Sequence, residues 1–227
     1  MVVIRNVFST HLKVHKKYDL KGSRVDREAS DKEREKSVPT LKDNDFLADG
    51  VKINIGVEGK EALMETLSAD VEFLSRLNII GYSLLVGIHD MDRALEDVLD
   101  QQAEEDDDDE EYDSCGSGAM ALTPPESPNT GRKISAGIMV NQASRIDPNL
   151  DIYAIPSLAA SHAGVCSGQK HIYFLSIMDV LTHYGIKKAA AKAAKTMKYG
   201  SEVDGISTAE PEQYSKRFLA FINEAIE

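Results

Sequence analysis

Asp179 is the acidic residue best placed for metal chemistry, because it directly follows an apolar run at 172–178 that predicts a buried strand. A carboxylate held at the end of such a strand can coordinate Mg²⁺, and the metal ion can bridge the phosphates of a nucleotide. The commoner alternative is an aspartate that caps a strand at a turn, and Asp179 by itself does not separate the two. The lysine-rich segment that follows it favours the metal-binding interpretation.

That segment, residues 187–198, contains five lysines and no acidic residue. Alanine and lysine both favour helix, and Lys188, Lys192 and Lys195 would share one helical face. The opposite face is mostly alanine, so binding to an anionic membrane would depend on charge, on the order of 1 kcal/mol per lysine. A solvated alanine-rich helix is one alternative. A DNA-binding segment is another, and it is disfavoured because no arginine or aromatic residue is interleaved to contact bases.

A second basic group surrounds Gly22, a residue type that permits a tight turn. Its members are Lys16, Lys17, Lys21, Arg24, Arg27 and Lys42. A turn at Gly22 could bring Lys21 and Arg27 towards one phosphate, which arginine binds through two parallel hydrogen bonds. The alternative is an exposed basic loop, and the acidic residues between 28 and 35 are consistent with it.

The elements that must position these groups follow from the spacing of apolar residues. Leucine and valine at steps of three and four predict an amphipathic helix over 58–77. Pro211 suits the first position of a last helix over 211–226. We also expect strands at 1–8, 14–20, 151–155 and 171–180, a buried hairpin or strand pair broken by glycines over 79–88, and an exposed loop over 22–45.

The net charge of −12 comes from one tract rather than from the whole chain. Residues 96–113 hold twelve acidic residues and no lysine or arginine, and the remaining 26 acidic residues balance the 26 basic ones. The surrounding stretch has few large apolar residues and is rich in proline and serine. We therefore predict that residues 94–145 form a disordered insertion inside one domain, rather than a boundary between two domains.

Membrane and redox signals are weak in this chain. The sequence has no apolar run of 18 residues, so we expect no transmembrane helix. Cys115 and Cys166 do not have the spacing of a disulfide framework. These features predict a cytoplasmic protein, peripheral at membranes, with a nuclear location as the alternative.

Several motifs resemble those of the phosphatidylinositol phosphate kinase family, most closely its type II group, the phosphatidylinositol-5-phosphate 4-kinases. The motifs are RNVFS (5–9), VHKKYDLKGS (14–23), REASDKE (27–33), KDNDFL (42–47), DVEFL (70–74), YSLLVGIHD (82–90), IMD (177–179) and PEQYSKRF (211–218). They cover nearly the whole chain apart from the insertion.

The resemblance implies that residues 1–227 are the C-terminal part of the catalytic domain. That part would be an α/β (α+β) kinase-related large lobe with antiparallel strands and packed helices. Its cofactors would be ATP and Mg²⁺, with Asp179 as the catalytic and metal-binding aspartate. Residues 1–8 would form a hinge strand. The nucleotide-binding residues would be Asn6, Phe8, Leu85 and Met178.

The resemblance also implies a phosphoinositide lipid at a membrane surface as partner, and no nucleic acid. Lys21, Arg27 and Lys42 would contact its phosphates, and Lys21 would also be catalytic. The lysine-rich segment would be the specificity loop, with Lys187, Lys188, Ala191, Lys192 and Lys195 as its functional residues. Alanine at position 191, where type I enzymes have glutamate, favours phosphatidylinositol 5-phosphate as substrate and phosphatidylinositol 4,5-bisphosphate as product.

Two departures from the family pattern bear on activity. Gly81 stands where the family has an aspartate that is the candidate base or positioning group for the substrate hydroxyl, and Gly185 also replaces an aspartate. The resemblance further implies that the small lobe is missing, and with it a glycine-rich phosphate cover, a nucleotide-binding lysine and any dimer contact. Phosphoryl transfer depends on positioning and charge stabilisation. We therefore expect a truncated, inactive lipid kinase, and the alternative is a non-catalytic phosphoinositide-binding or kinase-partner scaffold.

Overall fold

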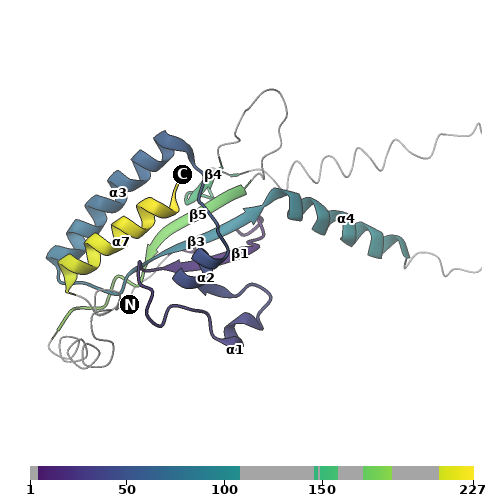
Figure 1. Cartoon of the computed structure of the whole chain (residues 1–227). Helices are drawn as coiled ribbons and strands as arrows, with labels where there is room; N and C mark the ends of the chain where they lie inside the picture. The colour runs from purple at the N-terminus through teal and green to yellow at the C-terminus, as the bar shows by residue number, and fades with distance from the viewer. Residues whose placement is uncertain (1–4, 108–145, 148, 158–170, 186–209) are drawn as a thin grey trace, which may run out of the picture.

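The structure, a computed structural model, describes residues 5–107, 146–147, 149–157, 171–185 and 210–227, with side chains up to 100 in the first range. Five strands form one mixed sheet in the order β2-β1-β3-β5-β4 (Figure 1). They are β1 (Lys16–Leu20), β2 (Thr40–Lys42), β3 (Ser83–Asp90), β4 (Ala154–Pro156) and β5 (His171–Met178). The β1·β2 pair is parallel and the other pairs are antiparallel. The chain is therefore a mixed α/β protein, as the sequence predicts.

The main core lies between one face of this sheet and two long helices, α3 (Gly56–Arg76) and α7 (Pro211–Ala225) (Figure 1). Alternation along β3 directs Leu84 and Val86 into this core. The helices contribute apolar residues at steps of three and four, namely Leu67, Val71 and Leu74 from α3, and Tyr214, Phe218 and Ile222 from α7. Both predicted helices are confirmed within a few residues of their expected bounds.

A smaller apolar cluster covers the opposite face of the sheet. Its buried members are Val7, Leu12, Ile172 and Phe174. Residues 5–8 reach this face because β3 has Gly87 there. A Cβ atom on that glycine would lie 2.5 Å from Cε1 of Phe8. Residues 5–8 are not a strand, so the strand predicted over 1–8 is wrong for its described part, and residues 1–4 lie outside the described range.

Residues 22–45 are only in part the exposed loop that their charge suggests, because residues near both ends of this range are buried. They include the short helix α1 (Asp31–Arg34), strand β2 and the start of α2 (Asp43–Ala48). Asp43 and Asp45 are buried, because each accepts backbone N–H groups and pairs with an arginine. Composition records the charge of such residues, but it does not record that the charge is neutralised inside the fold.

Two further expectations are corrected. In place of the hairpin or strand pair predicted over 79–88, residues 83–88 belong to one strand, β3, whose partners β1 and β5 are distant in sequence, and Ile79 forms only an isolated bridge with His183. Residues 94–107, which we predicted to be disordered, belong to the helix α4 (Met91–Asp107), and residues 108–145 lie outside the described range. The carboxylate of Asp90 caps α4 by accepting the N–H groups of Asp92 and Arg93 at 3.0 and 3.2 Å.

Candidate active site

The ends of three strands bring Lys21, Gly81 and Asp179 together. Lys21 follows β1, Asp179 follows β5, and Gly81 lies two residues before β3, which pairs with both. The Lys21 ammonium donates a hydrogen bond of 2.6 Å to the Gly81 carbonyl oxygen, and it lies 3.5 Å from Oδ2 of Asp179. The Lys21 side chain is only 15% exposed, whereas that of Asp179 is 65% exposed. A held cation thus faces a carboxylate that is open to a ligand.

The backbone at this site adopts left-handed conformations. Gly81 has a φ of 83° and Asp179 a φ of 62°, a region in which glycine is unstrained and aspartate is tolerated better than most residues. The nearest atom to a Cβ built on Gly81 is Cβ of Thr182 at 3.9 Å. Conformation, and not crowding, therefore limits what can replace this glycine.

An apolar surface lies beside the charged group, on the sheet face opposite to the main core. Phe8, Leu85 and Met178 are partly buried against the smaller cluster, and Met178 directly precedes Asp179. The ring of Phe8 meets Phe174 edge to face at a centroid distance of 6.3 Å. The Asn6 side-chain oxygen accepts the Phe8 N–H at 3.2 Å, which fixes the local turn. The structure therefore gathers three of the four predicted nucleotide-binding side chains, and it places Asn6 next to one of them.

The donor groups present fit a magnesium ion that is shared with a nucleotide. Within the described residues, three or more His, Cys, Asp or Glu side chains do not gather at any point to form an all-protein metal site. Mg²⁺ in phosphoryl-transfer sites commonly takes one or two carboxylates and completes its shell with substrate phosphates and water. The exposed carboxylate of Asp179 at the edge of an apolar surface meets that requirement.

The residues predicted to bind lipid phosphates lie in different surroundings. Nε of Arg27 donates to Oδ2 of Asp43 at 2.6 Å, and Nη2 donates to the Asp19 carbonyl oxygen at 2.5 Å. The Arg27 side chain is 10% exposed, so little of its guanidinium faces solvent. Lys42 precedes α2, and its backbone N–H donates to Asp45 at 3.0 Å. Their roles as lipid ligands stay predictions.

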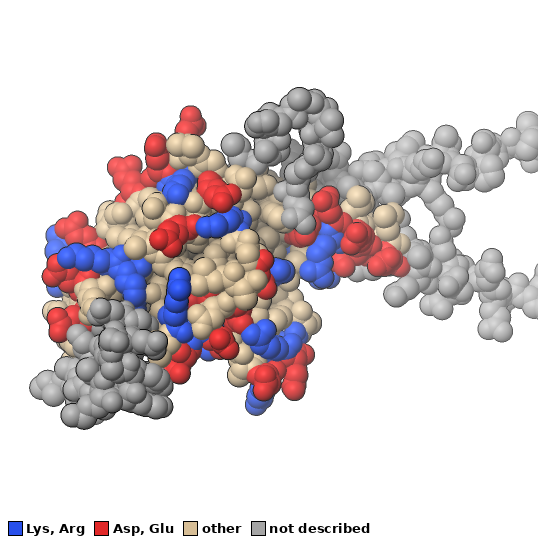
Figure 2. Space-filling view, viewed as in Figure 1, with Lys and Arg blue, Asp and Glu red and all other residues tan. Residues whose placement is uncertain are grey.

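The residues predicted to act in a specificity loop lie outside the described residues, namely Lys187, Lys188, Ala191, Lys192 and Lys195. On the face shown in Figure 2, the described basic and acidic side chains are interspersed, and no extended area of one sign is visible. The distribution of charge on this face therefore gives no independent support to a membrane contact. The described part of the chain contains no helix with the length and hydropathy needed to cross a bilayer.

Sequence reasoning missed Asp43, which lies next to the predicted Lys42. The Asp43 carboxylate is fully buried, and its Oδ1 accepts the backbone N–H groups of Lys21, Gly22 and Ser23 at 2.9, 2.7 and 3.3 Å. A weak signal was available, because acids at 43 and 45 precede Phe46 in a pattern typical of a helix start. The contact itself joins residues about twenty positions apart, so only the fold reveals it.

The chain is similar to known phosphoinositide kinases over nearly its whole length. The family model described as Phosphatidylinositol-4-phosphate 5-Kinase matches residues 1–225. Phosphatidylinositol 5-phosphate 4-kinase type-2 beta of Homo sapiens is 49% identical over 227 residues, which cover 98% of this chain and 52% of that protein. The type-2 alpha proteins of Homo sapiens and Gallus gallus are each 49% identical over 222 residues, with the same coverage. The chain thus spans about half the length of the curated relatives it matches.

Proposed function

The chain belongs to the phosphatidylinositol-4-phosphate 5-kinase family, and from this premise we propose that it forms the large-lobe part of a lipid kinase site. The proposed reaction transfers the γ-phosphoryl group of ATP to the 4-hydroxyl of phosphatidylinositol 5-phosphate, giving phosphatidylinositol 4,5-bisphosphate. We further propose that these 227 residues by themselves do not carry out this transfer. The observation that carries the proposal is the convergence of Lys21, Gly81 and Asp179 beside an apolar surface.

Each described residue at the site has a role that its chemistry supports. Asp179 would hold Mg²⁺, which when bound neutralises charge on the β- and γ-phosphates. The Lys21 ammonium would stabilise negative charge on the phosphoryl oxygens during transfer, because a preorganised cation is most effective where water is excluded. Phe8, Leu85 and Met178 offer an apolar surface to the adenine ring.

Gly81 limits the reaction at the proton-transfer step. The transfer breaks the bond between the γ-phosphorus and the oxygen that leaves with ADP, and it forms a bond to the inositol oxygen, whose proton must leave. A base or positioning carboxylate is generally worth about 10²–10⁴-fold in rate. Glycine has no side chain to supply one, and the Lys21 ammonium is bonded to the Gly81 backbone carbonyl. This observation favours the alternative, a non-catalytic member that binds phosphoinositide or a kinase partner.

An activity comparison tests the proposed reaction. The chain and its Gly81→Asp variant would each be assayed alone and joined to the small lobe of a type II family member, with radiolabelled ATP and phosphatidylinositol 5-phosphate. We expect substantial product only from the joined protein that carries Gly81→Asp. Gly81→Asn is the matched control, because it adds the same heavy-atom shape in the same left-handed backbone without the carboxylate. Robust transfer by the unmodified 227 residues, or equal rescue by asparagine, would contradict the role assigned to position 81.

Vesicle binding distinguishes the alternative function. A non-catalytic member should bind phosphoinositide-containing vesicles in a salt-sensitive way without turnover, since exposed charges are screened over about 8 Å at physiological salt. Replacing four of the five lysines of the proposed specificity loop by glutamine should reduce this binding. The four are Lys187, Lys188, Lys192 and Lys195. Binding that survives both high salt and these substitutions would refute the proposed membrane contact.

A further inference from the structure

We propose that Asp43 is a positioning residue for Lys21, and that Arg27 acts with it as its counter-ion rather than as a surface ligand. The functional part of this inference rests on the proposed phosphoryl transfer, because it assigns Asp43 the task of holding the Lys21 ammonium in the site. The geometric part stands on the hydrogen bonds of the described residues. Lysine labelling and turnover, measured on the same variants, separate the two parts.

The first step is the way in which Asp43 shapes the turn after β1. One oxygen of its carboxylate accepts three successive backbone N–H groups, those of Lys21, Gly22 and Ser23. Successive N–H groups converge on one anion only when the backbone curls into a concave nest, and the φ of 67° at Gly22 supplies that curl. The carboxylate is completely buried, so these bonds to a charged acceptor are not diluted by water.

The second step is the charge balance of the buried carboxylate. An isolated buried charge is very costly, and a paired one is tolerated when its hydrogen bonds are complete. Arg27 provides the pair, because its Nε donates to the second oxygen of Asp43 at 2.6 Å. The same guanidinium donates to the carbonyl of Asp19, two residues before Lys21. Arg27 and Asp43 thus hold the turn from both of its ends.

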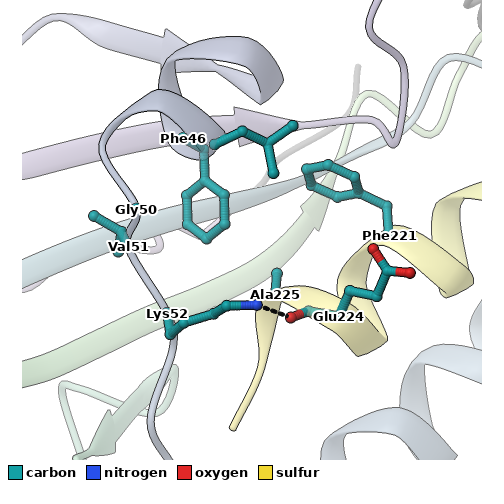
Figure 3. A pocket seen from close by; sticks show the side chains of 8 residues that line it. Phe46, Gly50, Val51, Lys52, Phe221, Glu224 and Ala225 are labelled. Atoms are coloured by element: carbon teal, nitrogen blue, oxygen red, sulfur yellow. Dashed lines mark hydrogen bonds between the residues drawn. The ribbon is translucent and has the colours of Figure 1, made fainter.

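The third step is the rigid support behind Asp43 and behind the turn. Helix α2, which begins at Asp43, is anchored by Phe46, whose ring lies 5.1 Å from that of Tyr18 and 6.3 Å from that of Phe221. Figure 3 shows Phe46 and Phe221 bordering the same small hollow, which Lys52 also lines while donating to the Glu224 carbonyl at 2.5 Å. The support therefore comes from both β1 and α7.

Helix α7 also supports the turn directly. A Cβ on Gly22 would lie 3.0 Å from the Arg217 carbonyl oxygen and 3.0 Å from Cα of Phe218, so only glycine fits between the turn and this helix. The turn is therefore fixed by Asp43 on one side and by α7 on the other. The Lys21 side chain then extends from a fixed backbone to the Gly81 carbonyl and Asp179.

The proposal is tested by the reactivity of the Lys21 ammonium, a readout that does not require turnover. The full chain and its Asp43→Asn variant would be treated with a limiting acylating reagent, and the modification of each lysine would be followed by mass spectrometry. The introduced asparagine keeps an oxygen acceptor but removes the charge that Arg27 balances. We expect the labelling rate of Lys21 to rise by roughly tenfold, as weakening of hydrogen bonds to a charged group implies.

Lys60 provides the internal control for this measurement. Its ammonium is also held by hydrogen bonds, donating to the carbonyls of Asn223 and Ile226 at 2.8 Å, but it lies on α3. Lys60 labelling should stay unchanged. An unchanged Lys21 rate in folded Asp43→Asn would overturn the proposal, and so would an equal rise at Lys60, because that would indicate general loosening. If Asp43→Asn does not fold, Arg27→Lys is tested in its place. This substitution keeps the positive charge but removes the guanidinium that donates to both Asp43 and Asp19, so Lys21 labelling must rise there too.

The functional part is read from the joined, Gly81→Asp form of the protein. There Asp43→Asn should lower kcat by about tenfold or more while the KM for lipid changes little, because the lost interaction is one that acts in the transition state. A rise in Lys21 labelling with a normal kcat would overturn the positioning role. A rise in labelling in a protein that never shows transfer in any form would refute the proposed function and leave the geometric part standing.

Discussion

The two ends of the β1·β3 pair bury ionisable side chains in opposite ways. At the end that leads to Lys21, the buried Asp43 carboxylate pairs with Arg27, and every contact described above is with a donor. At the other end, His15 and His89 are buried beside each other, with ring centroids 5.2 Å apart. These histidines are held in neutral forms. The comparison shows that the buried carboxylate of Asp43 has donors at both of its oxygens, whereas Nε2 of each buried histidine has no hydrogen-bond partner among the described residues.

The hydrogen bonds of the two histidines identify their tautomers. Nδ1 of His89 lies 2.7 Å from the Lys13 carbonyl oxygen, which can only accept, so that nitrogen carries the proton. Nδ1 of His15 accepts the Asp90 N–H at 2.9 Å, so that nitrogen must be unprotonated. Burial lowers the pKa of both rings, and the neighbouring His89 lowers the pKa of His15 further, against an opposing effect of Asp97. Adding a proton to His15 would break its bond to Asp90.

We expect the largest effect on stability at the Lys21 end, from loss of the packing between α7 and the turn after β1. Phe218 is fully buried, its ring meets Tyr82 edge to face at 5.2 Å, and its backbone contacts Gly22. We expect Phe218→Ala to lower the free energy of unfolding by about 3–5 kcal/mol, measured by urea denaturation. Phe73→Ala on α3 is the control, because that side chain is 54% exposed and should cost under about 0.5 kcal/mol. A loss below about 1 kcal/mol for Phe218→Ala would show that α7 does not brace this end.

The next effect is a pH dependence at the histidine end. Because the folded pKa values of His15 and His89 lie below 6.5, the unfolded chain binds more protons as pH falls through that value. The contribution of these two histidines to the free energy of unfolding is therefore fully present above about pH 6.5 and is lost as the pH falls below that value. The slope is at most about 1.4 kcal/mol per pH unit for each histidine. Unfolding free energies between pH 7.5 and 5.5 would measure the decline, in a range above the titration of most carboxylates.

Substitution of one histidine sharpens this measurement. In His15→Asn the side-chain oxygen can still accept the Asp90 N–H, but the residue does not titrate, so the slope should become shallower. His183→Asn, at an exposed position, should leave the slope unchanged. If His15→Asn keeps the full slope, the pH dependence does not originate in this pair.

The smallest effect is expected at the surface contact that holds α4 near the histidines. Lys13 Nζ lies 2.6 Å from Oδ2 of Asp97, but the two side chains are 62% and 38% exposed. Exposed pairs of this kind contribute about 0.2–1 kcal/mol and are weakened by salt. Lys13→Ala should therefore cost less than about 1 kcal/mol, and the difference from the unmodified chain should shrink in 1 M NaCl. A cost above about 2 kcal/mol would mean that α4 is an essential part of this end.

Local patterns were enough to predict the long elements and the family. Helix α3 was predicted from apolar residues at steps of three and four, and α7 was predicted from Pro211 at its start. Both signals repeat or act within one or two helical turns, so the local sequence is enough to show them. The family was predicted from short motifs, and the match over residues 1–225 confirms it. The same motifs predicted that Lys21 and Asp179 belong to one site, which the 3.5 Å separation of their charged atoms supports.

Tertiary structure alone decided which charged side chains are buried and which backbone groups they bind. In the sequence, Asp43 and Arg27 look like members of an exposed charged loop. In the fold both are buried, because they pair with each other although they are 16 positions apart in the chain. The continuous strand β3 was mistaken for a hairpin or strand pair, since its neighbours β1 and β5 come from distant parts of the chain. The free energy of a buried charge depends on partners that only the folded chain assembles, and composition carries no record of them.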